Sequence, residues 1–423
     1  MNGMNADVRI SNPGDWDIFH RKLLDVIVDP MVFRSAEIFF RGEKEATKTL
    51  PIGDAQTIWK ALSGDLGSLT SFFDQIILAY RLPVIDYGIT FDSAEVTFDS
   101  VFDPSRPWIS QFVNRELEED AVLTVHVQEA VSKEARTAAL SALAEKRPAD
   151  SVQLVEEVSR QLATFNYQWR PDLVKGDEDL PEEKKKIVAE LPALPQKELT
   201  FVRFLHGGLL FSAFCQMSGS SHVLQPRRWQ LLTAASIGAT SALKDEEELV
   251  AELDRRIQED QYYKNVHFGL LPSFLAYLLS LEPRSPLDLL SKAKKLRKDP
   301  EIDKYRMFRT KILQNWVKQG SIDPDDEKGI KQAALEIHNK LKVDKQFEVG
   351  CDFGPKIGWE KDGFKGIGID AALKIPVPIG RIWGWILENL PGGRYIKVLT
   401  RLKLAQHQYP KFERYLREIW SNA

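Results

Sequence analysis

The stretch FLHGGLLFSAFCQMSGSSH, residues 204–222, concentrates side chains that could carry out nucleophilic chemistry. It holds two histidines, several serines and one of the 2 cysteines of the chain. A hydroxyl or thiol group becomes a strong nucleophile when a neighbouring histidine takes up its proton. The residue types therefore raise the question of an acyl-transfer site, and the answer depends on the element that positions them.

The surrounding sequence favours a buried helix over an active site. The HGG at residues 206–208 resembles the oxyanion-hole turn of lipase-like α/β-hydrolases, but that fold also needs a G-x-S-x-G turn downstream, and none occurs. At helical spacing, His206 and Leu210 share one apolar face, and the two glycines allow another helix to approach closely. We therefore predict a structural core helix in which Cys215 packs as a small hydrophobic side chain.

Metal and phosphate sites lack their usual motifs. The 7 histidines are scattered, without the H-x-x-x-H or H-E-x-x-H spacing that places two ligands on one helical face. No G-x-x-x-x-G-K-[ST] loop occurs, and the glycines of GFKGIGID (363–370) lie within a predicted hairpin. The sequence therefore predicts no cofactor, and a metal only in the following alternative.

That alternative is a metal-dependent nuclease. Such enzymes hold Mg²⁺ against phosphate with an Asp on one strand and a Glu, near a Lys, on the next. Asp352 and Glu360, followed by Lys361, stand in this order within predicted β structure. Because Glu360 and Lys361 are adjacent, their side chains point to opposite faces of a strand, which departs from the E-x-K spacing of these enzymes.

The run SKAKKLRKDPEIDKYRMFRTK, residues 291–311, is the best candidate for nucleic-acid binding. Its cations are dense enough to neutralise phosphates, and Tyr305 and Phe308 could stack on bases. The alternative is a pair of amphipathic helices that buries Leu289 and Leu296 and leaves the basic face in water. The predicted nucleic-acid-binding residues are Lys294, Lys295, Lys298, Arg306 and Arg309.

The spacing of apolar residues predicts a mainly α, multi-helical fold. It includes a short N-terminal β-hairpin and a small α+β C-terminal region that contains a second β-hairpin. Dense prolines and charges indicate a linker or an exposed excursion between two helical domains. The predicted division is a mostly helical domain with the short hairpin over residues 1–170, the charged linker over 171–198, a helical domain over 199–345 and the α+β region over 346–423.

Local signals predict individual helices. Apolar stripes indicate helices over 54–65 and 68–80, and a long alanine-rich helix from Leu117 to about Lys146. Residues 285–320 predict two helices that meet near residues 299–300, since Ser285 and Pro286 suit the start of the first and a proline begins the second.

The two hairpins follow from alternating residues and turn signals. VIDYGITF (84–91) and AEVTF (94–98) predict the N-terminal hairpin. In the C-terminal region, Asp362-Gly363 is a strong turn signal, and a two-residue turn there places Glu360 opposite Lys365 as a cross-strand ion pair.

Length and composition indicate a globular protein of two or three domains. Of its 423 residues, 43% are apolar, enough for well-packed cores. The 2 cysteines, Cys215 and Cys351, cannot form a disulfide framework or a cysteine-based zinc site. No basic segment followed by an apolar run begins the chain, and no apolar run is long enough to cross a bilayer. We therefore predict a cytoplasmic protein without membrane contact.

Charge is divided unevenly along the chain. Residues 284–423 contain 28 Lys and Arg against 18 Asp and Glu, whereas residues 1–283 contain 29 against 43. Such asymmetry suggests an anionic partner for the C-terminal part. The alternative is that the two ends of the chain neutralise each other.

Three stretches resemble segments of uncharacterised bacterial proteins that are often encoded near phage-defence genes. They are LTSFFDQIILAYRLPV (69–84), GLLFSAFCQMSGSSHVLQPRR (208–228) and LPSFLAYLLSLEPRSPLDLLSKAKKLRKDPEIDKYR (271–306). The likeness lies in the pattern of helices and of Leu-Arg and Tyr-Arg pairs, and it implies a bacterial protein with a conflict-related role.

These observations predict a non-enzymatic adaptor or sensor subunit of a bacterial multiprotein system, acting in anti-phage defence and binding other protein subunits. The prediction rests on a large chain with ample core and no assembled catalytic motif in its sequence. The alternative function is a nucleic-acid-binding protein or a metal-dependent nuclease that uses the basic C-terminal region.

Overall fold

The chain forms two compact units. The first comprises Met1–Phe72, Ala79–Lys244 and Trp420–Ala423, and the second comprises Phe73–Leu78 and Asp245–Ile419. The predicted domain boundaries stay predictions. The computed structural model describes residues 8–24, 26–49, 54–86, 108–146, 179–194, 196–218, 220–223, 225, 228, 274–319, 324–341, 358–360, 363–365 and 412–423.

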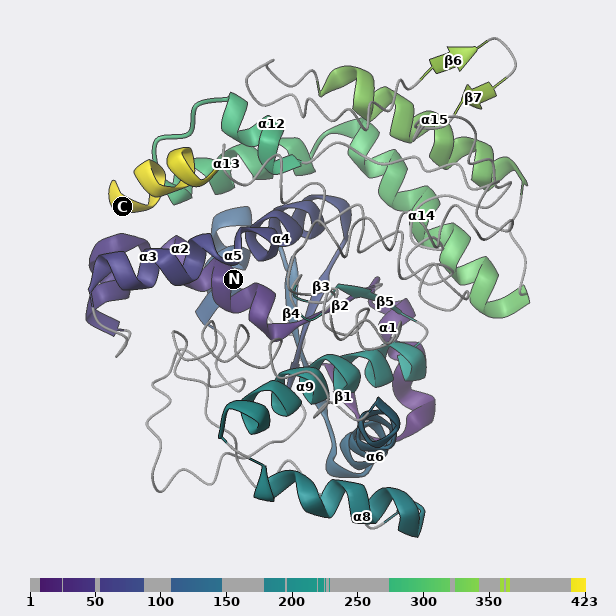
Figure 1. The fold of residues 1–423 in the computed structure, drawn as a ribbon. Coiled ribbons are helices and arrows are strands. Elements are labelled where there is room, and N and C mark those ends of the chain that lie inside the picture. The colour runs from purple at the N-terminus through teal and green to yellow at the C-terminus, as the bar shows by residue number, and fades with distance from the viewer. Residues whose placement is uncertain are drawn as a thin grey trace. The chain divides into compact units, whose positions relative to one another are not determined.

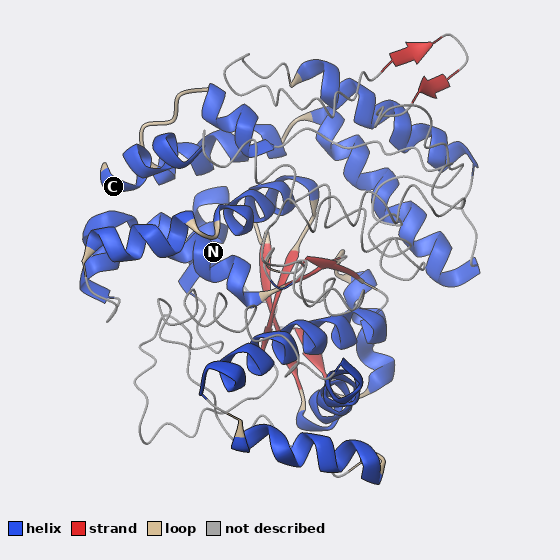
Figure 2. Ribbon diagram, viewed as in Figure 1, coloured by secondary structure: helices blue, strands red, loops and turns tan. Residues whose placement is uncertain are grey.

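Helices dominate the described residues, which confirms the predicted mainly α class (Figure 2). The sequence predicted α3 (Ala55–Ser63) of the first unit and α4 (Leu66–Leu78) to within a few residues. The last residues of α4, Phe73–Leu78, belong to the second unit. Helix α3 begins where Asp54 accepts a hydrogen bond from the backbone N–H of Thr57 at 2.7 Å. The other helices of the first unit are η1 (Pro13–Trp16), α1 (Asp17–Arg21), α2 (Pro30–Thr49), α5 (Trp108–Leu117), α6 (Glu129–Lys146), α8 (Glu182–Glu190), η5 (Leu191–Ala193) and α9 (Gln196–Ser218).

Parallel strands lie among these helices. Strands β1 (Val8–Ile10), β4 (Val122–Val127) and β3 (Leu82–Asp86) form a sheet in the order β1-β4-β3. Strands β2 (Val26–Val28) and β5 (Ser221–Val223) form a second parallel pair. All three residues of β2 are buried, as expected for a strand of a parallel sheet that is covered on both faces.

The prediction of a single long helix from Leu117 to Lys146 is wrong. The chain forms α5, then β4, then α6 (Figure 1). The sequence VLTVHV of β4 is rich in β-branched residues, which favour a pleated surface. The side chain of Asn114 also pairs with the backbone of Val122, donating to its carbonyl at 2.7 Å and accepting from its N–H at 2.8 Å.

Only residues 84–86 of the predicted N-terminal hairpin are described, so the hairpin stays a prediction. Residues 82–86 form β3, which pairs in parallel with β4. The predicted partner, residues 94–98, lies outside the described residues. The pairing of β3 with a strand about forty residues further along depends on long-range packing rather than on a local turn.

Helix α9 contains most of the histidine- and serine-bearing stretch of residues 204–222, and the prediction of a core helix there is confirmed. Leu205, Phe214 and Cys215 are buried, and α9 packs beside α6 (Figure 1). The ring of Phe214 lies 5.9 Å from that of Trp16, at the end of η1. The cysteine packs in this apolar environment as a small hydrophobic side chain.

Residues 420–423 pack against α2 and α3 within the first unit. Trp420 donates a hydrogen bond from its ring Nε1 to the carbonyl of Ile38 at 3.1 Å, and its ring lies 5.5 Å from that of Trp59. Helix α2 is interrupted at Gly42, which has φ of 68°. A Cβ on Gly42 would come within 2.3 Å of the Cβ of Ala423, so both the backbone conformation and the close approach require glycine there.

The second unit is built mainly from helices. The predicted junction of two helices at residues 299–300 is confirmed, because α13 ends at Arg297 and α14 begins at Pro300. Ser285 caps α13 by accepting a hydrogen bond from the N–H of Asp288 at 3.2 Å. The labelled helices are α12 (Phe274–Ser280), α13 (Pro286–Arg297), α14 (Pro300–Gln319) and α15 (Pro324–Lys340).

Strands β6 (Gly358–Glu360) and β7 (Gly363–Lys365) pair antiparallel in the second unit. Their register joins Glu360 to Gly363 and Gly358 to Lys365, instead of the predicted pair of Glu360 with Lys365. Residues 361 and 362, between the two strands, lie outside the described residues. Asp362 and Gly363 are both tolerant of turn conformations, so the sequence did not distinguish the two registers.

Candidate functional site

The predicted nucleic-acid-binding residues separate into an exposed group and a buried group. On α13, Lys295 and Lys298 are exposed and Lys294 is half-buried. On α14, only 6% of Arg306 and 5% of Arg309 is exposed. Lys295 and Lys298 of α13 are therefore accessible from solvent, whereas the two arginines of α14 are buried in the unit.

The buried arginines of the second unit bind the ends of helices. Arg309 donates from Nη1 to the carbonyl of Leu78 at 2.9 Å, and Arg297 donates to the carbonyl of Ile76, so both serve the last turn of α4. Arg306 donates to the carbonyl of Arg297 at the end of α13. The last carbonyls of a helix have no hydrogen-bond donors within the helix, and they carry partial negative charge. A buried arginine supplies both the missing donor and the compensating positive charge.

The sequence contained a signal for this arrangement. Ile302, Tyr305, Arg306 and Arg309 are spaced as one helical face, and all four are buried. An arginine on an apolar stripe is placed to extend its guanidinium group to a buried acceptor. In this structure Arg306 and Arg309 serve helix ends, and their binding of nucleic acid stays a prediction.

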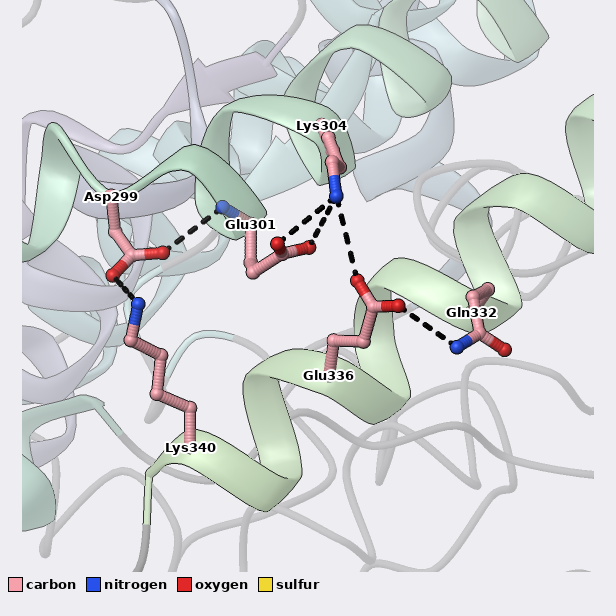
Figure 3. A network of polar contacts seen from close by, with 6 residues as sticks. All are labelled: Asp299, Glu301, Lys304, Gln332, Glu336 and Lys340. Atoms are coloured by element: carbon pink, nitrogen blue, oxygen red, sulfur yellow. Dashed lines mark hydrogen bonds and ion pairs between the residues drawn. The ribbon is translucent and has the colours of Figure 1, made fainter.

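Several lysines of the second unit form ion pairs between α14 and α15 (Figure 3). Lys304 lies 3.0 Å from Glu301 and 3.7 Å from Glu336, and the hydrogen bond with Glu301 raises the pKa of Lys304. Lys340 of α15 pairs with Asp299, the residue before α14 (Figure 3). These ion pairs connect α15 to α14 and to the residue before it.

Two further lysines are also paired. Lys292 of α13 lies 2.8 Å from Asp288, one turn earlier, and this contact lowers the pKa of Asp288. Lys311 of α14 lies 2.5 Å from Asp326 of α15. By contrast, in the part of the chain that the structure describes, no ion pair includes Lys295. The same holds for Lys298.

The residues predicted for a nuclease metal site are only partly described. Asp352 and Lys361 lie outside the described residues, and Glu360 ends β6. The nuclease site therefore stays a prediction. Among the described residues, there is no group of three or more His, Cys, Asp and Glu side chains that could hold a metal ion.

A buried polar cluster in the first unit was missed by the sequence analysis. We call Asp29, Ser35, Asp65, Gln225 and Arg228 the two-aspartate cluster; each of its members is at most 5% exposed. Asp29 follows β2 directly, and its backbone N–H donates to the carbonyl of Val223 at the end of β5. The cluster therefore lies where the carboxyl ends of these parallel strands meet, the edge at which polar groups of α/β folds gather.

Asp29 makes an ion pair and backbone hydrogen bonds within the two-aspartate cluster. Its Oδ1 lies 2.5 Å from Nη1 of Arg228 and accepts from the N–H of Met31 at 3.0 Å. Its Oδ2 accepts from the N–H of Gln225 at 3.2 Å. A fully buried carboxylate is stable only when it is paired and hydrogen-bonded in this way.

Asp65 is the centre of the other half. Its carboxylate accepts from the hydroxyl of Ser35 at 2.5 Å and from Nε2 of Gln225 at 2.8 Å. Burial removes the charge from water and raises the pKa of Asp65 to about 6, an effect that the nearby charge of Asp29 increases and the hydrogen bonds oppose. Gln225 therefore links the two carboxylates, through its backbone to one and its side chain to the other.

The glycines of the HGG sequence have a role in this cluster. A Cβ on Gly207 of α9 would come within 2.6 Å of Nη2 of Arg228. The absence of a side chain at this position therefore lets the guanidinium group lie against the helix. The glycines predicted the close approach of another helix, but the group that lies against Gly207 is the side chain of Arg228.

The contacts of the two-aspartate cluster connect parts of the first unit that lie far apart in the sequence. Every contact described above is made by one member to another or to nearby backbone, and these contacts hold Gln225 and Arg228 against β2, α2 and the start of α4. Removing one partner of a buried ion pair is costly, because the other charge is then buried without compensation.

No protein-family model matches the chain, and neither a curated protein nor a solved structure matches it. In the described residues, no helix is both long and apolar enough to cross a membrane.

Proposed function

We propose that this chain is a non-enzymatic adaptor or sensor subunit of a multiprotein system. The observation that carries the proposal is the distribution of exposed apolar side chains. Among the described residues, the large apolar side chains that are exposed all belong to the second unit: Leu281, Leu287, Met307 and Tyr415. Contiguous exposed apolar patches rimmed by polar residues are typical of surfaces that bind other proteins.

The use of charged groups supports the same proposal. Asp29, Asp65 and Arg228 bind one another in the first unit, and the arginines of α13 and α14 bind helix ends in the second. Groups of these types can carry out acid–base chemistry when they are poised toward a substrate. Here their contacts within the fold support a structural use.

The bacterial and anti-phage setting of the proposal comes from the resemblance of the three sequence stretches. In such a system, the partners would be the products of neighbouring genes. An adaptor that contacts them through the second unit would bring an effector to its trigger without performing the chemistry itself.

The test measures assembly with those products. The purified chain would be mixed with each of them and examined by size-exclusion chromatography with light scattering. We expect a complex of defined stoichiometry, and we expect Leu281→Arg with Met307→Asp to weaken it more than about tenfold, since charged groups would replace apolar contacts. A chain that stays a solitary monomer with every neighbour would count against the adaptor role.

The matched control is Lys44→Ala with Lys60→Ala, two exposed positions on α2 and α3 of the first unit. Substitutions at exposed sites usually change the free energy of unfolding by less than about 0.5 kcal/mol, so both double variants should remain folded. Equal weakening of the complex by both would contradict a partner surface on the second unit.

A further inference from the structure

We propose that the surface of α2 and α3 around Trp59 is a peptide-docking site. Its occupant is the chain's own Trp420–Ala423, which we call the docked segment, and it is held there as an exchangeable ligand rather than as a fixed part of the core. The proposal rests on the contacts of these residues with α2 and α3. It does not depend on the adaptor role.

The docked segment enters the first unit from a part of the chain that belongs to the second. Residues 412–421 are helical, but the second unit extends to Ile419 and only Trp420–Ala423 belongs to the first unit. The preceding stretch of the first unit ends at Lys244. The position of the docked segment in the first unit is therefore determined by its own contacts and not by adjacent backbone of that unit.

Trp420 makes the main contact of the docked segment. Its side chain is 1% exposed, its ring lies 5.5 Å from that of Trp59, and its Nε1 donates to the carbonyl of Ile38 at 3.1 Å. A buried aromatic side chain of this size removes about 150–250 Å² from water, and tryptophan is enriched among the residues that dominate binding at interfaces. A short peptide can therefore derive most of its affinity from this one side chain.

The rest of the docked segment lies on the surface of α2. Residues 421–423 are exposed, and the hydroxyl of Ser421 donates to Oε2 of Glu43 at 2.7 Å. Among the described residues, both hydrogen bonds from the docked segment to α2 thus start from side chains. By contrast, β2 and β5 of the same unit are joined by backbone pairing. One buried side chain with an exposed flank is the pattern of a bound peptide.

Helix α2 is shaped to receive the docked segment. It is interrupted at Gly42, which has φ of 68°, and a Cβ there would overlap with the Cβ of Ala423. Glycine is among the least favourable residues in the interior of a helix. The interruption therefore weakens α2 at the position where it makes room for the docked segment.

One donor of the docking site is not used by its present occupant. Trp59 is 4% exposed, and in the part of the chain that the structure describes its ring Nε1–H is buried without a hydrogen-bond acceptor. Nearly all buried polar groups of a protein core have such a partner. The docked segment therefore satisfies the site incompletely, as expected of a ligand that can be exchanged.

The test is binding of a fluorescein-labelled peptide of residues 417–423, blocked at both ends, to the full chain that carries Trp420→Ala. This variant vacates the site, so we expect saturable binding in fluorescence anisotropy. The wild-type chain should bind the same peptide at least about tenfold more weakly, because its own segment competes at an effective concentration of roughly millimolar order.

The matched control chain carries Arg417→Ala, at an exposed position of the same helix. Its site stays occupied, so it should bind the peptide as weakly as the wild type does. A peptide with Trp420→Ala should bind the vacated chain at least about tenfold more weakly than the native peptide, since it lacks the main contact. A peptide with Arg417→Ala should match the native one within about threefold, because exposed side chains around a buried contact contribute little.

Circular dichroism establishes whether the Trp420→Ala chain is folded. If it is not, Trp420→Phe replaces it, since phenylalanine keeps an aromatic ring and removes only the hydrogen bond to Ile38. That chain should bind the peptide about three- to fivefold more tightly than the wild type, as expected for the loss of one hydrogen bond by the competing segment.

Three results would overturn the proposal. A folded variant that binds the peptide no more tightly than the wild type would show that Trp420–Ala423 is a fixed part of the core. Failure of both variants to fold would show the same. Equal binding of the peptides with and without tryptophan would place the binding outside the site around Trp59.

Discussion

The guanidinium group of Arg228 lies against the backbone of Gly207, so closely that a Cβ at that glycine would come within 2.6 Å of Nη2. The same guanidinium group lies 2.5 Å from Asp29. The absence of a side chain at this position of α9 thus makes room for a buried ion pair between Arg228 and Asp29, the residue that follows β2. Several testable consequences come from this relationship and from the buried arginines of the second unit.

Gly207→Ala should destabilise the first unit by about 1–3 kcal/mol, although alanine favours a helix by about 1 kcal/mol over glycine. The added methyl group must displace Arg228 and weaken its contact with Asp29. Chemical denaturation followed by circular dichroism measures the change. The matched control is Gly64→Ala, where the nearest atom to an added Cβ is 3.4 Å away, and no loss of stability is expected there.

Arg228→Met should destabilise the first unit by about 3–5 kcal/mol, because it leaves the carboxylate of Asp29 buried without its cation. Adding Asp29→Asn to Arg228→Met should restore part of that loss, since no charge then remains to be buried. The coupling in a double-mutant cycle measures the interaction. Additive effects would show that the ion pair contributes little.

Asp65→Asn should change how stability depends on pH. The pKa of Asp65 is about 6 in the folded chain and about 3.9 in an unfolded one, so the folded state holds the proton more tightly. Its stabilising contribution is therefore complete below pH ~4 and is lost as the pH rises through ~6. Two pKa units correspond to at most about 3 kcal/mol.

The asparagine variant should remove this pH dependence and be more stable than the wild type near pH 7. Its amide can accept from Gln225 and donate to Ser35, so the main contacts of the carboxylate have replacements. Denaturation curves between pH 4 and 8 measure the effect. Parallel curves for the two proteins would mean that Asp65 does not titrate in this range.

Arg309→Met should lower the stability of the second unit by about 1–3 kcal/mol, because the carbonyl of Leu78 loses its buried donor. Hydrogen exchange resolved by mass spectrometry would locate the loss at α4 and α14. Lys295→Met is the matched control on the exposed face of α13, and it should leave exchange unchanged. The two variants separate the structural cations from the surface ones.

The nuclease alternative has a direct assay. If Asp352 and Glu360 hold a divalent ion, the purified chain should degrade DNA or RNA with Mg²⁺ or Mn²⁺. Asp352→Ala should then abolish cleavage and leave the melting temperature nearly unchanged. A wild-type protein that is inert on several nucleic acids would exclude this function.

Helix ends and apolar faces were predictable from the sequence, since their causes act over a few residues. The cap of Asp54 on Thr57 and that of Ser285 on Asp288 each span three positions, and the predicted helices begin there. The stripe of α9 likewise repeats every three or four residues. Because such signals are local, they can be recognised in the sequence without knowledge of the fold.

The parallel sheet and the two-aspartate cluster were decided only by the tertiary structure. Asp65 and Gln225 are 160 residues apart, and Asp29 and Arg228 are 199 apart, so no local spacing connects them. Strand β4 was hidden within an alanine-rich helical pattern because its partners β1 and β3 lie far from it along the chain. In the same way, the sequence alone did not distinguish the roles of Lys295 and Arg309. Tertiary packing leaves Lys295 exposed to solvent and buries Arg309 against the end of α4.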